Sequence, residues 1–179
     1  MILELKRLPI LETERLRLEP LTPEDARHIF PIMDDPEVMA YWDWPEIDDP
    51  DVVAEIVRSQ VEAMGAGKAI HWAIRTLTGG EFIGACELSA IDRKHRRAEM
   101  NFMLSRDAWG HGYGLEVMRN VTAYAAVSGL RKLTARTHLG NRRSENLLQK
   151  LGFREEGLLR GHILKDGERR DCRIFGLLL

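Results

Sequence analysis

The residues best suited to chemistry lie in a glycine-rich loop past the middle of the chain. The loop reads Trp109-Gly110-His111-Gly112-Tyr113-Gly114, and the apolar pattern of a helix follows it from Leu115. Glycine has no Cβ, so its backbone approaches a ligand closely and adopts dihedral angles that other residues avoid. The unpaired N–H groups and the dipole at the start of a helix favour an anion. The loop therefore predicts a pyrophosphate site.

Two common pyrophosphate motifs do not fit this spacing. A Walker A loop has the form G-x-x-x-x-G-K-[ST], and no lysine follows these glycines at that interval. A dinucleotide fingerprint has the form G-x-G-x-x-G, but after Gly110 and Gly112 the third glycine position holds Leu115. A nucleotide-binding protein of either kind is therefore disfavoured. An ordinary strand-to-helix turn is the structural alternative.

A strand before the loop and a helix after it must position these glycines. The alternation over 99–104 predicts the strand, and the stripe Val117, Met118, Val121, Tyr124 and Ala125 predicts the helix. Asp166-Gly167 predicts a hairpin turn between the last two strands. Further strands are expected over 14–19, 71–76, 81–88 and 132–138 and around 163 and 172–178, and further helices from 22, at 35–37, over 48–64 and over 144–151. This order predicts a single α/β domain, 1–179, with a mixed sheet.

The composition limits the classes of protein to which the chain can belong. The 179 residues are 44% hydrophobic and 30% charged, and the net charge is −2, as expected for a globular domain. So small a net charge gives no reason to expect a nucleic-acid partner. No apolar run has the length of a membrane span, so no membrane partner is expected. Glu4, Lys6 and Arg7 interrupt the apolar residues after Met1, which argues against a signal peptide.

The two cysteines, Cys86 and Cys172, lie in apolar or alternating runs, where cysteine behaves as a small buried hydrophobic residue. No Cys or His spacing is typical of zinc, so we expect no metal. We expect the protein to lie in the reducing cytoplasm.

Four segments in a fixed order carry a family signature. They are 13–18 with 21–25, then 97–104 running into 109–114, then 141–146 leading to 150–157, and Asp171 in the final strand. With these segments the chain resembles the GNAT superfamily of acetyl-CoA-dependent N-acetyltransferases, and within it the RimJ/RimL branch, which acetylates protein N-terminal amines and other primary amines. The resemblance covers nearly the whole chain from about Leu11. Trp109 stands where the family often has Arg or Gln.

The resemblance implies a mostly antiparallel sheet flanked by helices, an α/β (α+β) GNAT fold in which two central strands splay apart. Acetyl-CoA would enter the gap between the strand ending near Leu104 and the strand ending near His138. Asn141 would bond the pantetheine arm, although it is also suited to cap a helix. The implied cofactor contacts are Met103, Leu104, Ser105, Trp109, Gly110, His111, Gly112, Tyr113, Gly114, Leu115 and Asn141.

Amide formation from a thioester requires removal of a proton from the ammonium and protonation of the departing sulfur. Glu99 is the candidate base, and if it holds that role, Glu99→Gln should lower turnover by about 10²–10⁴. The structural alternative pairs Glu99 with Arg96 or Arg97. His138 is a reserve base. Ser144 matches the serine of the family's N-x-x-S and is the candidate donor to the thiolate, with a first-turn helix role as its alternative.

Trp42 and Trp44 are expected to line the acceptor side together with Tyr41, whereas Trp72, inside a strand, is expected in the core. The acceptor would be a small-molecule amine or a protein N-terminus, a ribosomal protein being one such partner. Exposed edge strands are consistent with a homodimer. A non-catalytic acyl-CoA-binding module on the same fold is the alternative to an enzyme.

Overall fold

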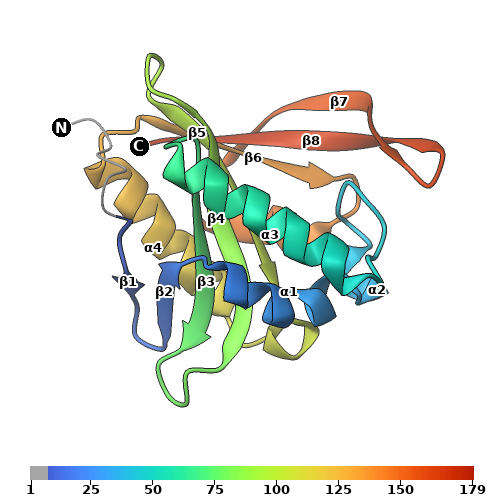
Figure 1. Cartoon of the computed structure of the whole chain (residues 1–179). Coiled ribbons are helices and arrows are strands. Elements are labelled where there is room, and N and C mark those ends of the chain that lie inside the picture. The colour runs from blue at the N-terminus through green and yellow to red at the C-terminus, as the bar shows by residue number, and fades with distance from the viewer. Residues whose placement is uncertain (1–7) are drawn as a thin grey trace.

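A computed structural model, which describes residues 8–179, has one eight-stranded sheet as its frame (Figure 1). The strands lie in the order β1-β2-β3-β4-β5-β6-β8-β7, and every neighbouring pair is antiparallel except β5 and β6. The segment that was considered for a signal peptide lies outside the described residues. The strands are β1 (Leu11–Glu12), β2 (Leu16–Pro20), β3 (Ile70–Thr76), β4 (Phe82–Asp92), β5 (Arg97–Leu104), β6 (Lys132–His138), β7 (Arg154–Lys165) and β8 (Glu168–Leu178).

Helices cover both faces of the sheet (Figure 1). Helices α1, α2 and α3 lie on one face, and α4 lies on the other, beside α5. The predicted start at Thr22 opens with a single 3₁₀ turn (η1), which α1 continues. The helical segments are η1 (Pro23–Asp25), α1 (Ala26–Met33), α2 (Pro36–Met39), α3 (Pro50–Gly65), η2 (Arg106–Ala108), α4 (Tyr113–Val127) and α5 (Arg142–Lys150).

Side-chain alternation along the strands divides the core between the two faces. On the α4 face, Trp72, Met100 and Leu133 pack with Val117 and Val121 of the helix. Trp72 is fully buried, as expected for a core residue. On the opposite face the residues that alternate with these are smaller or polar, and the apolar side chains of α1 and α3 cover only part of that surface. This second face therefore has room for a site.

The two central strands diverge as expected. Strands β5 and β6 pair in parallel only from Arg97↔Lys132 to Glu99↔Thr134. Beyond that point β6 stays with β8 up to His138↔Cys172, while β5 stays with β4 up to Gly84↔Leu104. Because each strand follows its outer neighbour, a gap opens between Leu104 and His138.

The last two strands form the predicted hairpin. Asp166 and Gly167 have φ values of +54° and +78°, which is the conformation of a two-residue type I′ turn. Next to this turn, Lys165 Nζ donates to the carbonyl of Met39 at 2.6 Å and is buried. The hairpin thus holds the end of α2, from which the loop with Trp42 and Trp44 continues. Among residues 8–179, no helix is long and apolar enough to cross a membrane.

Candidate active site

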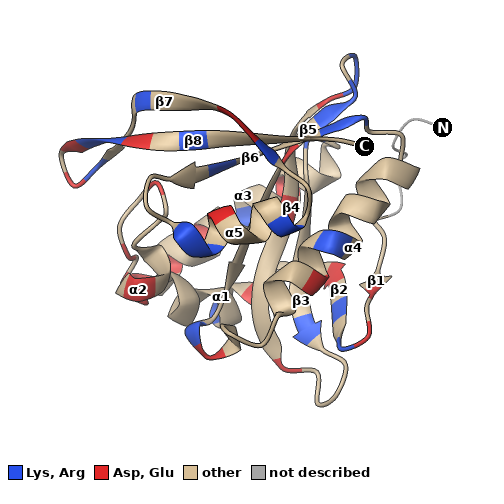
Figure 2. Cartoon of the chain, turned by 180° about the vertical axis from the view of Figure 1, so that it is seen from behind, with Lys and Arg blue, Asp and Glu red and all other residues tan. Residues whose placement is uncertain are grey.

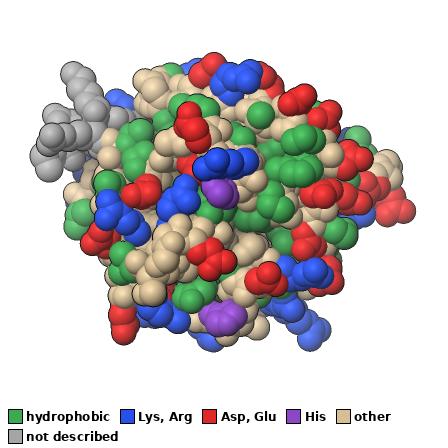
Figure 3. Space-filling view, turned by 60° about the horizontal axis from the view of Figure 1, so that its bottom comes forward, with side chains coloured by type: hydrophobic (Ala, Val, Ile, Leu, Met, Phe, Trp, Pro, Cys, Tyr) green, Lys and Arg blue, Asp and Glu red, His purple; other side chains and the backbone are tan. Residues whose placement is uncertain are grey.

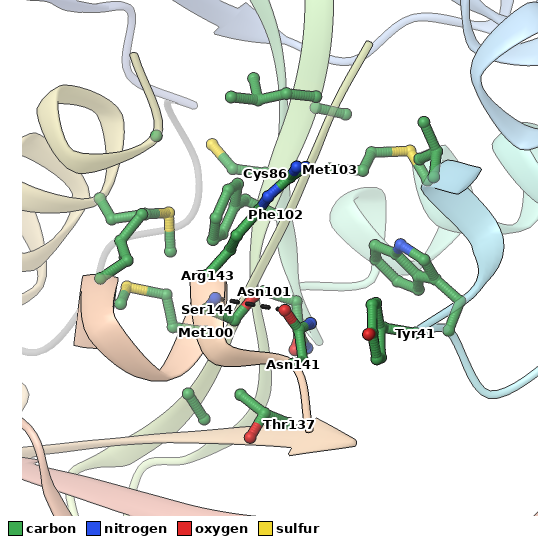
Figure 4. Close-up of a pocket in the computed structure, with 18 of the residues that line it drawn as sticks. Tyr41, Cys86, Met100, Asn101, Phe102, Met103, Thr137, Asn141, Arg143 and Ser144 are labelled. Carbon is green, nitrogen blue, oxygen red and sulfur yellow. Dashed lines mark hydrogen bonds between the residues drawn. The ribbon is translucent and has the colours of Figure 1, made fainter. Parts of the chain in front are cut away.

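A cavity of about 1310 Å³ occupies the gap between the diverging strands (Figure 4). Its walls come from the loop after α2, the central strands, the glycine loop with the start of α4, and the start of α5. Most of the predicted site residues line it. These are Trp42, Trp44, Glu99, Met103, Leu104, Trp109, Gly110, Gly112, Tyr113, Gly114, Leu115, His138, Asn141 and Ser144, whereas Ser105 and His111 lie outside the lining.

The glycine loop has the geometry that an anion cradle requires. Gly110 and Gly112 have φ values of +79° and +80°, which side chains with a Cβ rarely adopt. Gly112 is the N-cap residue of α4. The carbonyl of His111 points away from the cleft and accepts from Arg15 Nη1 at 3.0 Å. The following N–H groups at the start of α4 are therefore available for an anion.

Helix α5 carries basic side chains (Figure 2) and lies beside the glycine loop, where Arg143 contacts Trp109. Arg142, Arg143 and Lys150 of this helix line the cavity. The Arg143 guanidinium lies 4.6 Å from the centre of the Trp109 ring, so a cation sits on the tryptophan that replaces the family's usual Arg or Gln. Asn141 caps the helix, as its structural alternative predicted, and its Oδ1 accepts from the Ser144 N–H at 3.3 Å.

The alternation of hydrogen bonds along β5 decides which of its backbone groups face the gap. The Ser105 N–H donates to the carbonyl of Ile83 at 2.9 Å, so the odd-numbered residues of β5 turn their backbone groups toward β4. The backbone groups of Phe102 and Leu104 consequently face the gap. The Leu104 carbonyl accepts from Trp109 Nε1 at 3.1 Å, which leaves the Leu104 N–H and the Phe102 groups on the open edge.

One buried hydroxyl in the cavity wall has no partner. Thr137 lies on β6 and lines the cavity, and its Oγ is the one fully buried side-chain nitrogen or oxygen atom without a hydrogen bond among residues 8–179. An unsatisfied buried hydroxyl needs a partner, but this Oγ has no exposed surface, so a ligand atom bonds it only after the side chain rotates toward the cavity. Thr137 is therefore a candidate for the cofactor wall, although the sequence singled it out for no such role.

On the other side of the cavity, Glu99 has a different partner from the ones predicted. Its Oε1 accepts from Arg136 Nε at 2.9 Å, whereas Arg97 pairs with Asp92. The expected pairing with Arg96 or Arg97 is wrong, because β5 and β6 run side by side here and bring Arg136 over Glu99 on the same face. Burial lowers the pKa of Arg136, but Glu99 and Asp43 raise it, and the net pKa is raised.

The aromatic loop is tied to β6 by a carboxylate. Asp43 Oδ1 lies 3.0 Å from His138 Nε2, and its Oδ2 lies 3.8 Å from Arg136. The His138 hydrogen bond holds the pKa of Asp43 below its usual range, against the opposing effect of burial and with help from Arg136. The rings of Trp42 and Trp44 flank this contact, with their centres 6.0 Å apart. His138 thus reaches the gap as expected and is engaged in holding the loop.

Three further polar residues share the same sheet face and were not predicted. His71, Glu87 and Asn101 are in register across β3, β4 and β5, and all three line the cavity. Burial raises the pKa of Glu87, but hydrogen bonds from His71, Asn101 and Ser89 lower it, and they prevail. Their signal is an alternation of polar residues within otherwise apolar strands.

The match to a family model is extensive. The acetyltransferase (GNAT) domain model matches residues 15–154. The chain belongs to the GNAT acetyltransferase family. The predicted acyltransferase class is thereby confirmed, and the glycine loop, β5 and α5 of this GNAT domain all lie within the matched region.

Curated relatives agree with this assignment. The chain is 30% identical over 171 residues, 95% of its length and 97% of the relative's, to an uncharacterized N-acetyltransferase, YoaA, of Bacillus subtilis. It is 25% identical over 158 residues, 88% of its length and 82% of the relative's, to a spermidine N(1)-acetyltransferase of Escherichia coli.

Solved structures match this GNAT domain in fold. A spermidine N-acetyltransferase of Vibrio cholerae, in complex with CoA and spermine, has a TM-score of 0.80 at 22% identity, covering 91% of this chain and 95% of that one. RimL, a ribosomal alpha-N-protein acetyltransferase in complex with coenzyme A, has a TM-score of 0.87 at 16% identity, covering 96% and 98%. The predicted fold is confirmed, whereas the RimL branch rests on this fold-level match alone.

Proposed function

We propose that this protein transfers the acetyl group of acetyl-CoA to a primary amine by direct attack of the amine on the thioester. The observation that carries the proposal is the division of charge along one cavity. Arg142, Arg143 and Lys150 line its α5 end, and four acids, Glu37, Asp43, Glu87 and Glu99, line the remainder, where, among residues 8–179, Arg136 is the one basic side chain and pairs with Glu99 and Asp43. A basic end suits the phosphates of CoA, and an acidic end suits a cationic amine.

The residues present fit the cofactor. The pyrophosphate would lie on the N–H groups after Gly112, beside Arg143. The pantetheine arm would pair with the open edge of β5 at Phe102 and Leu104, and Thr137 Oγ would gain its missing partner. Bound acetyl-CoA supplies an activated acyl carbon, so the protein has to position the amine, accept its proton and protonate the leaving sulfur.

Different residues of the site would perform these tasks. The Leu104 N–H on the open edge is placed to donate to the carbonyl oxygen as negative charge develops on it. Ser144 lines the cavity next to Asn141 and is proposed to donate its hydroxyl proton to the sulfur (Figure 4). Trp42 and Trp44 would form the wall of the acceptor pocket. The acceptor is a small-molecule amine or a protein N-terminus. The protein acts in the cytoplasm and needs no metal.

The test is release of CoA thiol from acetyl-CoA, followed with a thiol reagent, in the presence of pooled alkyl amines and N-terminal peptides. Amine-dependent thiol release and an acetylated product detected by mass spectrometry are the expected results. Tight binding of acetyl-CoA without turnover with any amine would instead identify a non-catalytic binding module.

A further inference from the structure

Three polar side chains that line the cavity lie side by side on one face of the sheet. His71, Glu87 and Asn101 follow one another in register across β3, β4 and β5, on the sheet face that α3 covers. His71 Nδ1 lies 3.0 Å from Glu87 Oε2, and the exposed fraction of the His71 side chain is 9%. In such a pair a partly buried carboxylate orients a buried imidazole.

The Glu87 carboxylate is saturated with donors. Its Oε1 accepts from Ser89 Oγ at 2.9 Å and from Asn101 Nδ2 at 3.2 Å, while Oε2 faces His71. A carboxylate with three partners is poorly placed to accept a further proton from substrate. Its contact with Nδ1 places the ring proton on that nitrogen, and the lone pair of the imidazole is then on Nε2.

The other ring nitrogen, Nε2, belongs to a residue that lines the cavity. No partner for it exists among residues 8–179, and it is not among the fully buried atoms that lack a hydrogen bond, so a part of its surface is open. A lone pair held by a second residue and open to a substrate cleft is the arrangement of a general base.

The surroundings of the imidazole are otherwise uncharged. From α3, Met64 Sδ accepts the His71 N–H at 3.1 Å, and Gln60 lines the same part of the cavity. From β2, the Leu21 N–H donates to the His71 carbonyl at 2.9 Å. Glu87 is therefore the charged group in direct contact with the ring.

The two other candidate bases are engaged elsewhere. Glu99 accepts from Arg136, and His138 Nε2 contacts Asp43 of the aromatic loop. The Glu99 carboxylate and His138 Nε2 are each bonded to another side chain of the protein, whereas His71 Nε2 has no such partner among residues 8–179.

We infer that His71 is the general base of the acetyl transfer and that Glu87 is its positioning residue. This inference rests on the proposed function. Strand β3 lies two strands from β5, roughly 10 Å at about 4.8 Å per strand, so the proton reaches Nε2 along a short chain of waters beside Asn101. His71 Nε2 accepts a proton from the substrate ammonium and releases it to solvent. The amine nitrogen then bonds to the acyl carbon, the C–S bond breaks with its electron pair on sulfur, and the second nitrogen proton reaches the sulfur to give the free thiol.

The test uses His71→Gln and Glu99→Gln, with His95→Gln as the matched control at an exposed histidine outside the cavity, and two acceptors. One acceptor is the best alkyl amine of the screen, which is an ammonium at neutral pH, and the other is hydroxylamine, which is neutral there. For His71→Gln we expect turnover with the alkyl amine to fall by about 10²–10⁴, and turnover with hydroxylamine to stay within about tenfold of wild type. His95→Gln should keep the turnover of the wild type with both acceptors.

Glu87→Gln provides a second readout that does not depend on the stability of the His71 variant. An amide at this position no longer fixes the ring proton on Nδ1, so turnover should fall with the alkyl amine and not with hydroxylamine, while acetyl-CoA affinity is unchanged. Equal losses with both acceptors for His71→Gln, or a loss confined to the alkyl amine for Glu99→Gln, would overturn the inference. If the wild-type protein acetylates no amine, the proposed function itself fails, which is a different result.

Discussion

Arg15 and Glu116 are 101 residues apart in the chain, and Arg15 Nη2 lies 2.6 Å from Glu116 Oε2. The other carboxylate oxygen, Oε1, accepts from Thr13 Oγ at 2.6 Å and from the Arg15 N–H at 3.0 Å. Glu116 lies in the first turn of α4, directly after the glycine loop. The turn before β2 thus fixes the end of the helix that is proposed to hold the pyrophosphate.

Replacing Glu116 with Gln should therefore weaken both the fold and the cofactor site. Burial raises the pKa of Glu116, but its bonds to Thr13 and Arg15 lower it, and the net pKa is lowered. A lowered carboxyl pKa stabilises the folded state above the unfolded value of about 4.3, and this contribution is lost as pH falls through the folded pKa. Since Arg15 is half-exposed, we expect a loss of about 1 kcal/mol at pH 7, or about 2–4 °C in Tm.

Thermal melts of the wild type and Glu116→Gln from pH 7 to pH 3 would check this prediction. The difference in Tm should shrink as the pH falls below about 4.3, because the wild-type carboxylate becomes protonated. A constant difference across this range would show that the charge of Glu116 contributes nothing.

The glycine loop allows a test that separates backbone strain from ligand contact. Gly112 and Gly79 have φ values of +80° and +88°, and a Cβ on either meets no atom closer than 3.6 Å. Alanine at either position should cost about 1–2 kcal/mol of stability, since both adopt left-handed backbone. Gly112→Ala alone should also lower acetyl-CoA affinity by about tenfold or more in calorimetry, because the strained backbone would shift the N–H groups that are proposed to hold the diphosphate. Equal affinities of the two variants would move the pyrophosphate elsewhere.

For Thr137 we predict the opposite effect, in which a variant loses acetyl-CoA affinity and keeps its stability. Because its buried hydroxyl has no protein partner, Thr137→Val should leave the free energy of unfolding unchanged or raised. Acetyl-CoA affinity should fall about 3–10-fold, the value of one hydrogen bond. Thr134→Val is the matched control on the same strand, since Thr134 Oγ already donates to the Ala98 carbonyl at 3.4 Å and does not line the cavity. A normal affinity for Thr137→Val would mean that its hydroxyl meets no part of the cofactor.

Local patterns in the sequence predicted the elements whose signals are themselves local. The glycine loop, the cap at Asn141 and the Asp166-Gly167 turn all depend on residues within a few positions of one another. The family's order of segments then predicted the splayed strands. The mixed character of the surface was also expected from the composition. Figure 3 shows acidic and basic side chains mixed with hydrophobic ones on the face that it presents.

The pairings inside the site could not be predicted, because strand register brings them together. His71 and Glu87 are 16 positions apart, and only the pairing of β3 with β4 places one against the other. The Asp43 and His138 contact spans 95 positions and joins a loop to a strand end. A lone histidine in a sequence gives no sign of such a partner, so the sequence assigned no role to His71.

The contact between Asp43 and His138 should affect binding of the amine and not binding of acetyl-CoA. Asp43→Ala removes the contacts to His138 and Arg136 and so releases the loop with Trp42 and Trp44. Because these rings would form the acceptor wall, the KM for the amine should rise about 5–30-fold, as expected for the loss of about 1–2 kcal/mol of binding. Acetyl-CoA affinity should not change, since α5 and the glycine loop do not depend on this contact.

Asp48→Ala is the control for this variant, because Asp48 is an exposed carboxylate of the same loop. Acrylamide should quench tryptophan fluorescence more strongly in Asp43→Ala than in Asp48→Ala, since a released loop exposes Trp42, which is now half-buried. An increase in KM without increased quenching would indicate that Asp43 contacts the amine directly, through its negative charge. Unchanged KM and unchanged quenching would show that the aromatic loop is held by its apolar packing rather than by Asp43.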